Sequence, residues 1–268
     1  MVATGQLPIP QITARRFGAR CLPALTDDAL YERTGVRVAF TGRAGGVSEG
    51  PYSSLNLGNH VGDDPASVER NRALVLEALD AADVPLVVPS QVHGEVVVEL
   101  DDASPEALDA AREAARAGAD ALVATVPGIA ALLCFADCVP VIVVSPTGRF
   151  AVAHAGWRGV ENGVAAKAVR ALARADAAEL GEDAASGYNV YVGPHIHASC
   201  FETGADVRKR FEDRFGSSCI PDERHVDLLE ALTVGLEEAG IDRARVADAG
   251  VCTVCSVSYT HLTLPTKR

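Results

Sequence analysis

Short apolar runs follow one another closely between residues 121 and 154, and this spacing constrains the fold more than any other feature of the chain. Each run has four to eight residues, and Gly, Pro or Asp separates it from the next. Runs of that length between turn residues are typical of buried β-strands, because a helix needs a longer periodic segment. The predicted strands are Ala121–Thr125, Ile129–Phe135, Val139–Ser145 and Phe150–His154.

Helical segments alternate with these strands along the rest of the chain. A helix is expected to begin at Asp64-Pro65, where Asp is a good N-cap and Pro suits the first helical position. Mixed strands and helices with tight turns predict an α/β protein, a three-layer α/β sandwich on a mixed sheet in a single domain. The other predicted helices are 104–118, 159–180, 204–214 and 226–239, and the other strands are 36–40, 84–99 and 188–192.

The net charge and the lengths of the apolar runs argue against nucleic acid and membranes as partners. The chain has 268 residues, of which 48% are hydrophobic, and its net charge is −12. An acidic chain has no electrostatic reason to bind nucleic acid or an anionic membrane surface. Asp137 and Pro140 interrupt the longest apolar run, so it falls short of the roughly 18 residues that a spanning helix needs. Since no secretory signal opens the sequence, we expect a cytoplasmic protein, either a monomer or a small homo-oligomer.

Three side chains that can bind a metal stand at predicted strand ends: His93 in SQVHG, Cys138 in ADCVP and His154 in AHAGWRG. Cys138 and His154 are 16 residues apart, which suits two neighbouring strands joined by the turn SPTG. A thiolate with two imidazoles is a familiar zinc ligand set, and three protein ligands leave a fourth position open, as in catalytic sites. Such a zinc ion would lower the pKa of a bound water towards ~7.

Other cysteines and histidines have simpler explanations. Cys134 is expected to be a small buried hydrophobe, the usual role of a lone cysteine in a strand. His195 and His197 in GPHIHA fit either ligands or an ordinary turn. The pair Cys252-x-x-Cys255 has no second pair in the sequence, so a zinc ribbon is not expected. His93-Gly94-Glu95 matches only part of the zinc deaminase signature, because the Pro-Cys-x-x-Cys is missing.

The loop TGRAGGVSEG places Arg43 among glycines. Backbone N–H groups of glycines and a bidentate guanidinium are well suited to phosphate. The Gly-Lys-Ser/Thr ending of a nucleotide-binding P-loop is absent, so the loop is either an anion site or a plain tight turn.

These motifs, taken in order, resemble a known family. The blocks TGRAGGVSEGPYSSLNLGNHVGDD, SQVHG, ADCVP, HAGWRG and GPHIHASCFE, spread over residues 35–253, are similar to the signature of the laccase-domain, or multicopper polyphenol oxidase, family. Members of that family are described as purine nucleoside phosphorylases. We therefore expect a lead-in at 1–34 and the domain at 35–253.

The resemblance implies a site and an activity. Its catalytic zinc would be held by His93, Cys138 and His154, with Cys138 and His154 in catalytic roles. Arg43 would lie at the substrate site and take part in catalysis, and Asn56 and Gln91, inside the same motifs, are expected to bind substrate. The implied reactions are phosphorolysis of adenosine, inosine and methylthioadenosine, and hydrolytic deamination of adenosine. Copper is a second candidate metal, although the sequence lacks the His and Cys clusters of a multicopper oxidase.

Two other functions fit the same residues. In a thiol hydrolase, Cys138 would be the nucleophile, His154 its base, and Asp137 or another polar group would orient the base. Such an enzyme would act on amides, including peptidoglycan precursors. The other alternative is a zinc-stabilised binding module without catalysis.

The end of the sequence departs from the family pattern. Family members continue from Cys252-Thr253 into an aromatic, Arg-rich block, whereas this chain reads VCSVSYTHLTLPTKR. We therefore treat residues 254–268 as an atypical tail, for which a non-native origin such as a frame change or a cloning scar is one explanation.

Overall fold

A computed structural model of the protein describes residues 5–256, and a mixed β-sheet lies at the centre of this part. The strand order is β11-β10-β8-β9-β6-β5. β8 pairs antiparallel with both β9 and β10, whereas β5 and β11 are added in parallel at the two edges. The strands are β5 (Val97–Leu100), β6 (Ala121–Ala124), β8 (Val139–Val144), β9 (Phe150–Ala155), β10 (Asn189–Val192) and β11 (Val246–Asp248).

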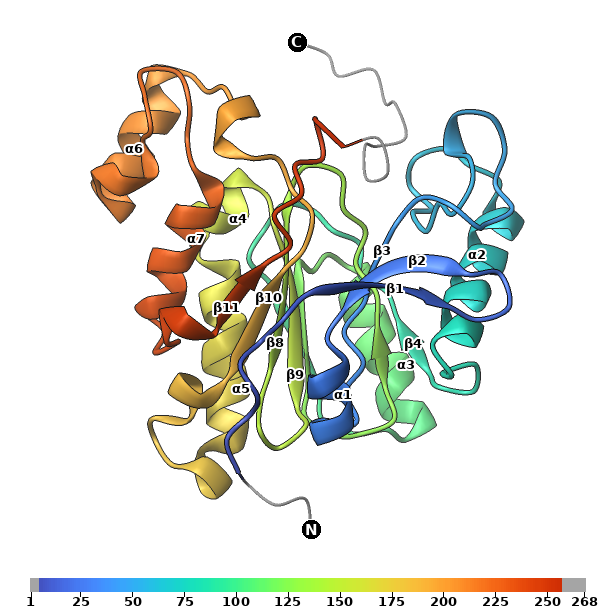
Figure 1. Ribbon diagram of the computed structural model, residues 1–268. Helices are drawn as coiled ribbons and strands as arrows, with labels where there is room; N and C mark the ends of the chain where they lie inside the picture. Colours follow the sequence, from blue (N-terminus) through green and yellow to red (C-terminus); the bar gives the residue numbers. More distant parts are fainter. Residues whose placement is uncertain (1–4, 257–268) are drawn as a thin grey trace.

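One face of this sheet packs against a layer of helices (Figure 1). Side chains alternate along β6, so Ala121 and Val123 join the core beneath these helices while Leu122 and Ala124 face the opposite way. Because both faces of the strand are buried, its residues are all apolar and pack alternately into two hydrophobic cores. The helices of this layer are α4 (Trp157–Asn162), α5 (Val164–Leu180), α6 (Ala205–Phe215) and α7 (Leu228–Glu237).

The other face carries a second layer (Figure 1). Leu108 of α3 packs in one core with Leu122, and Leu30 of α1 packs in another with Val144. The prediction of an α/β fold on a mixed sheet, with layers on both faces, is therefore confirmed. The elements on this side and beside it are β1 (Thr13–Phe17), β2 (Leu22–Thr26), α1 (Asp28–Thr34), β3 (Phe40–Thr41), α2 (Pro65–Ala78), β4 (Leu86–Val87), α3 (Pro105–Arg116) and β7 (Ala130–Ala131).

Several element boundaries differ from those predicted. The helix predicted over 159–180 is divided at Gly163, whose φ of 72° ends α4 before α5 begins. The strand predicted over 129–135 shortens to β7, because the backbone of Cys134 bonds to the Gln91 side chain instead of to a strand. Asp64 caps α2 as expected. Short 3-10 helices occur at Gly50–Tyr52, Ala184–Gly187, Ala198–Cys200, Ser217–Cys219 and Arg243–Arg245.

The start of the chain is more closely integrated than a lead-in. β1 pairs with β2, β2 pairs with β3, and Leu30 of α1 is fully buried. Most of the tail assigned to 254–268 lies outside the described residues, which end at 256. Among the described helices, none combines the length and the apolar character needed to cross a membrane.

A buried carboxylate fixes the turn between β8 and β9 to α5. Asp176 accepts hydrogen bonds from the Tyr188 hydroxyl at 2.6 Å, from Arg149 Nη1 at 2.7 Å and from Thr147 Oγ1 at 2.9 Å. Its side chain is completely buried. Asp176 therefore joins α5 to the turn after β8 and to Tyr188 through three hydrogen bonds.

Replacing this carboxylate tests its contribution to stability. We expect Asp176→Ala to lower the free energy of unfolding by about 2–3 kcal/mol, because buried donors lose their acceptor. The matched control is Asp213→Ala, which breaks an exposed pair with Lys209 and should cost at most about 0.5 kcal/mol. Urea unfolding followed by circular dichroism measures both. Equal losses in the two variants would contradict the assignment.

Candidate metal centre

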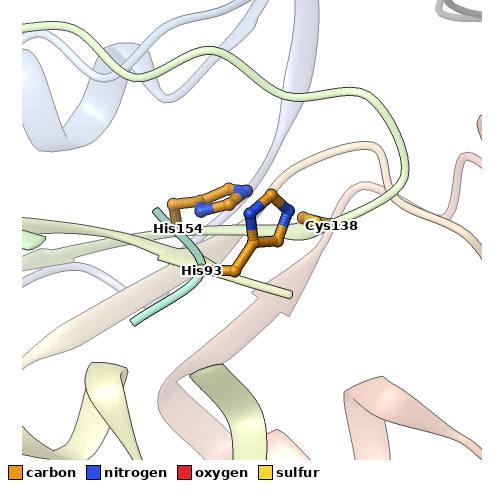
Figure 2. Close-up of side chains that lie close together, drawn as sticks. All are labelled: His93, Cys138 and His154. Carbon is orange, nitrogen blue, oxygen red and sulfur yellow. The ribbon is translucent and has the colours of Figure 1, made fainter. Parts of the chain in front are cut away.

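The structure brings His93, Cys138 and His154 together at one end of the sheet (Figure 2). Their ligand-capable atoms all lie within 4.8 Å of one another. His154 belongs to β9, where it pairs with Pro140 of β8, so Cys138 just before β8 lies at the same end. His93 comes from the loop between β4 and β5. The role of these side chains as metal ligands stays a prediction.

The carboxylate of Asp120 holds two of the three side chains. His154 Nδ1 lies 2.8 Å from Asp120 Oδ1. The same carboxylate accepts the backbone N–H groups of Val92, His93 and Gly94, at 3.3, 3.0 and 2.7 Å. Burial opposes ionisation of Asp120, but the bonds from His154 and the backbone outweigh it and lower its pKa. With Nδ1 committed to a carboxylate, Nε2 of His154 is the nitrogen left for a metal.

Asp120 also explains the unusual backbone of His93. This residue has a φ of 58°, in the left-handed region that non-glycine residues rarely adopt. The N–H bonds to Asp120 fix the loop in this conformation and aim the imidazole towards His154, with the ring centroids 4.8 Å apart. Partial desolvation and the neighbouring His154 lower the pKa of His93, which favours its neutral, ligating form.

Cys138 is poorly suited to ionise without a cation. Burial, together with the nearby carboxylates of Asp137 and Asp120, raises the pKa of its thiol to about 12. Asp137 itself accepts a hydrogen bond from Thr253 Oγ1 at 2.8 Å. A metal ion would reverse the balance, because it stabilises the thiolate directly.

The cluster packs directly against Gly156. A Cβ on Gly156 would come within 2.9 Å of His93 Cδ2 and 3.0 Å of Cys138 Sγ, so a larger residue there would displace these two side chains. One thiolate and two imidazoles fit zinc. The described residues contain two groups of three metal-capable side chains, this one and Cys200, Cys252 and Cys255. These residues therefore do not supply the histidine-rich clusters of an enzyme with several coppers.

Gln91 links the loops that carry His93 and Cys138. Its Nε2 donates to the carbonyl oxygen of Cys134 at 2.7 Å, and its Oε1 accepts the N–H of Cys134 at 2.8 Å. This two-point contact joins segments 43 residues apart. In the structure the Gln91 amide positions a loop, and whether it also contacts substrate stays open to experiment.

Arg43 and Asn56 belong to the glycine-rich loop that precedes α2. The Arg43 guanidinium donates to the Ser53 carbonyl through Nε at 3.1 Å and Nη2 at 2.8 Å. The buried Asn56 amide bonds with both backbone groups of Gly58 and donates to Asp63. Both residues therefore shape the loop, and their contact with substrate stays a prediction.

The side chains of Arg158 and His60 lie close enough to His93 to act on its imidazole. The charge of Arg158 helps to lower the pKa of His93, with a further contribution from His60. Arg158 is exposed, packs over the Trp157 ring at 4.3 Å, and within residues 5–256 is paired with no carboxylate. The guanidinium of Arg158 would attract an anionic group bound next to His93.

The histidines of GPHIHA do not join this site. His195 is buried and its Nδ1 bonds to the Gly193 carbonyl oxygen at 2.9 Å. Its ring packs against His197, with centroids 5.0 Å apart. The bond of His195 fits the turn that was one of the two interpretations, and within residues 5–256 neither histidine belongs to a group of three metal-capable side chains.

Sequence reasoning missed Asp120 and Arg158. A signal for Asp120 existed, because a charge directly before the apolar run that begins at Ala121 is costly unless a partner compensates it. Arg158 lies within HAGWRG, yet no pattern in the sequence places it near His93.

Asp120→Asn tests the positioning role of the carboxylate. An amide would place N–H donors against the donors of residues 92–94 and His154, so we expect zinc affinity to fall by about 10–100-fold. The exposed Asp109→Asn on α3 is the matched control and should keep wild-type affinity. Competition with a chromophoric chelator measures both, and unchanged affinity in Asp120→Asn would contradict the role.

Comparison with known proteins places the chain in a family. A model of the family described as multi-copper polyphenol oxidoreductase laccase matches residues 37–263. The chain is 35% identical over 226 residues to a purine nucleoside phosphorylase of Pseudomonas aeruginosa, across 81% of this chain and 83% of that protein. It is 33% identical over 243 residues to the purine nucleoside phosphorylase YlmD of Geobacillus stearothermophilus, across 85% of each.

Two solved structures resemble the fold of this chain. The crystal structure of YlmD from Geobacillus stearothermophilus matches with a TM-score of 0.71 and 27% identity, over 96% of this chain and 93% of that one. The crystal structure of the hypothetical protein YfiH of Bacillus licheniformis matches with a TM-score of 0.75 and 26% identity, over 89% of each. As the motifs predicted, the chain belongs to the multi-copper polyphenol oxidoreductase laccase family.

Proposed function

We propose that this chain is a zinc-dependent purine nucleoside phosphorylase that cleaves adenosine, inosine and methylthioadenosine with phosphate and also deaminates adenosine. The observation that carries the proposal is the group of His93, Cys138 and His154, organised by Asp120 beside the cation Arg158. Curated relatives named purine nucleoside phosphorylase support the substrate class.

The reaction sets the demands on the site. In phosphorolysis a phosphate oxygen bonds to the ribose C1′ while the bond from C1′ to the purine nitrogen breaks and its electron pair leaves with the base. In deamination, water adds at the purine C6 and ammonia leaves. A bound zinc ion would supply Lewis-acid stabilisation of the charge that develops during these steps.

The chain's own residues would do the positioning. Arg158 would hold the phosphate next to His93, because its guanidinium is near enough to that residue to lower its pKa, and the nearby His60 would add a hydrogen-bonding group. Arg43 would add a guanidinium at the edge of its loop. Asn56 and Gln91 would contribute to substrate binding mainly through the loops that their amides hold.

The test is a product assay with the purified, zinc-loaded protein. In phosphate buffer we expect adenosine to give adenine with ribose 1-phosphate, and also inosine, part of which is then cleaved to hypoxanthine. Removing phosphate should abolish adenine release but not inosine formation. The proposal fails if chromatography finds neither product. Cys138→Ala should lose both activities, whereas Cys134→Ala, which removes a thiol of the same loop outside the cluster, should retain them.

Arg158→Ala separates phosphate binding from the rest of catalysis. Loss of a charge-assisted contact worth about 1.5–3 kcal/mol predicts a rise of roughly 10–100-fold in the KM for phosphate. Deamination of adenosine, which uses no phosphate, should change far less. Arg174→Ala, which removes an exposed partner of Glu99, is the control. An unchanged KM for phosphate in Arg158→Ala would exclude this role.

One observation favours a second candidate, a thiol hydrolase acting on amides such as peptidoglycan precursors. Cys138 lies next to His154, and His154 in turn contacts the carboxylate of Asp120, as a nucleophile, its base and an orienting carboxylate would. The orienting residue is thus Asp120 and not Asp137. The raised pKa of Cys138 argues against it, because the thiolate is the nucleophile. Chelation should leave a thiol hydrolase active and alkylation should stop it.

A non-catalytic binding module would show neither activity but would lose thermal stability on chelation.

A further inference from the structure

A second group of cysteines lies outside the site described above. Cys200 ends the 3-10 helix Ala198–Cys200, and Cys252 and Cys255 lie in the turn that follows β11. Their three sulfur atoms lie within 4.8 Å of one another, and those of Cys200 and Cys255 are 3.6 Å apart. The sequence pair Cys252-x-x-Cys255 thus gains a third thiol from 52 residues earlier in the chain.

The backbone keeps the two segments in register. His195 and Cys252 form a parallel bridge, in which His195 N donates to Val251 O at 3.2 Å and Thr253 N donates to His195 O at 2.9 Å. The segments that leave β10 and β11 run beyond the same end of the sheet (Figure 1). The cluster is therefore set by the fold and not by chance contact of exposed side chains.

The sulfur of Cys252 accepts the backbone N–H of His197 at 3.5 Å. N–H groups directed at the first sulfur of a Cys-x-x-Cys turn stabilise a thiolate ligand.

We propose that Cys200, Cys252 and Cys255 bind a zinc ion at a structural site separate from the His93–Cys138–His154 centre. Three thiolates on one side of a tetrahedral ion leave one position for a water molecule or another donor. Each thiol gives up its proton when its sulfur bonds to the metal, so affinity rises with pH.

This site would support the first one. Thr253, between the two cysteines of the turn, donates through Oγ1 to Asp137, and Ile196 donates its N–H to the Asp137 carbonyl at 3.0 Å. Asp137 precedes Cys138 directly. A zinc ion that fixes the turn would therefore also fix the backbone next to Cys138. The proposal itself concerns metal binding and does not depend on the activity proposed above.

Metal content of four proteins, purified with zinc and freed of loosely bound ions, tests the proposal. Mass spectrometry should find about two zinc ions per wild-type chain and about one in Cys252→Ser. Cys138→Ala should also hold about one, because it loses the other site. Cys21→Ser, which removes an exposed thiol outside both groups, should keep two. A zinc content that Cys252→Ser leaves unchanged would overturn the proposal.

Cobalt provides a readout that does not depend on the folding of the Cys252 variant. In Cys138→Ala the only predicted site is the three-thiolate one, so added Co²⁺ should give strong near-ultraviolet sulfur-to-cobalt absorption. The absence of that absorption in folded Cys138→Ala would also overturn the proposal. Since neither readout uses nucleosides, failure here and failure of the proposed enzymatic function are distinguishable.

Discussion

The buried carboxylate of Asp120 is the constraint on which the candidate metal centre depends. It bonds to the imidazole of His154 in β9 and, at the same time, to three successive N–H groups in the loop that carries His93. A loop residue with a left-handed backbone and a strand residue are thereby held in one geometry before any ion binds. Such preorganisation is what a metal centre needs from the residues behind its ligands.

The sheet supplies the other half of the geometry. Antiparallel pairing of β8 with β9 brings Cys138 to the strand end where His154 lies, and Gly156, which has no Cβ, lets His93 and Cys138 pack directly against the backbone. Loops then complete the site: Gln91 joins the segment of Cys134 to that of His93, and Thr253 reaches Asp137 from the far end of the chain. The surroundings of the cluster thus come from segments spread over most of the sequence.

Features of the fold and the site that depend on local sequence patterns can be predicted from the sequence. Lengths of apolar runs and the turn at residues 145–148 suffice to place Cys138 near His154. The role of Asp120 cannot be predicted in this way, because it bonds mostly to backbone N–H groups. Every residue except proline has such a group, so the sequence does not show which residues Asp120 contacts. β1 was missed since its residues are largely exposed and include two arginines instead of an alternating apolar pattern. The nearness of Cys200 to Cys252 follows only from the pairing of segments beyond β10 and β11.

His93, Cys138 and His154 are proposed to bind one metal ion together. The most direct test is anomalous diffraction at the zinc absorption edge from crystals of the zinc-loaded protein. We expect a peak bounded by the sulfur of Cys138, Nε2 of His154 and a ring nitrogen of His93, with Zn–S at about 2.3 Å and Zn–N at about 2.0–2.1 Å. A zinc-loaded crystal without a peak among these three side chains would contradict the proposal.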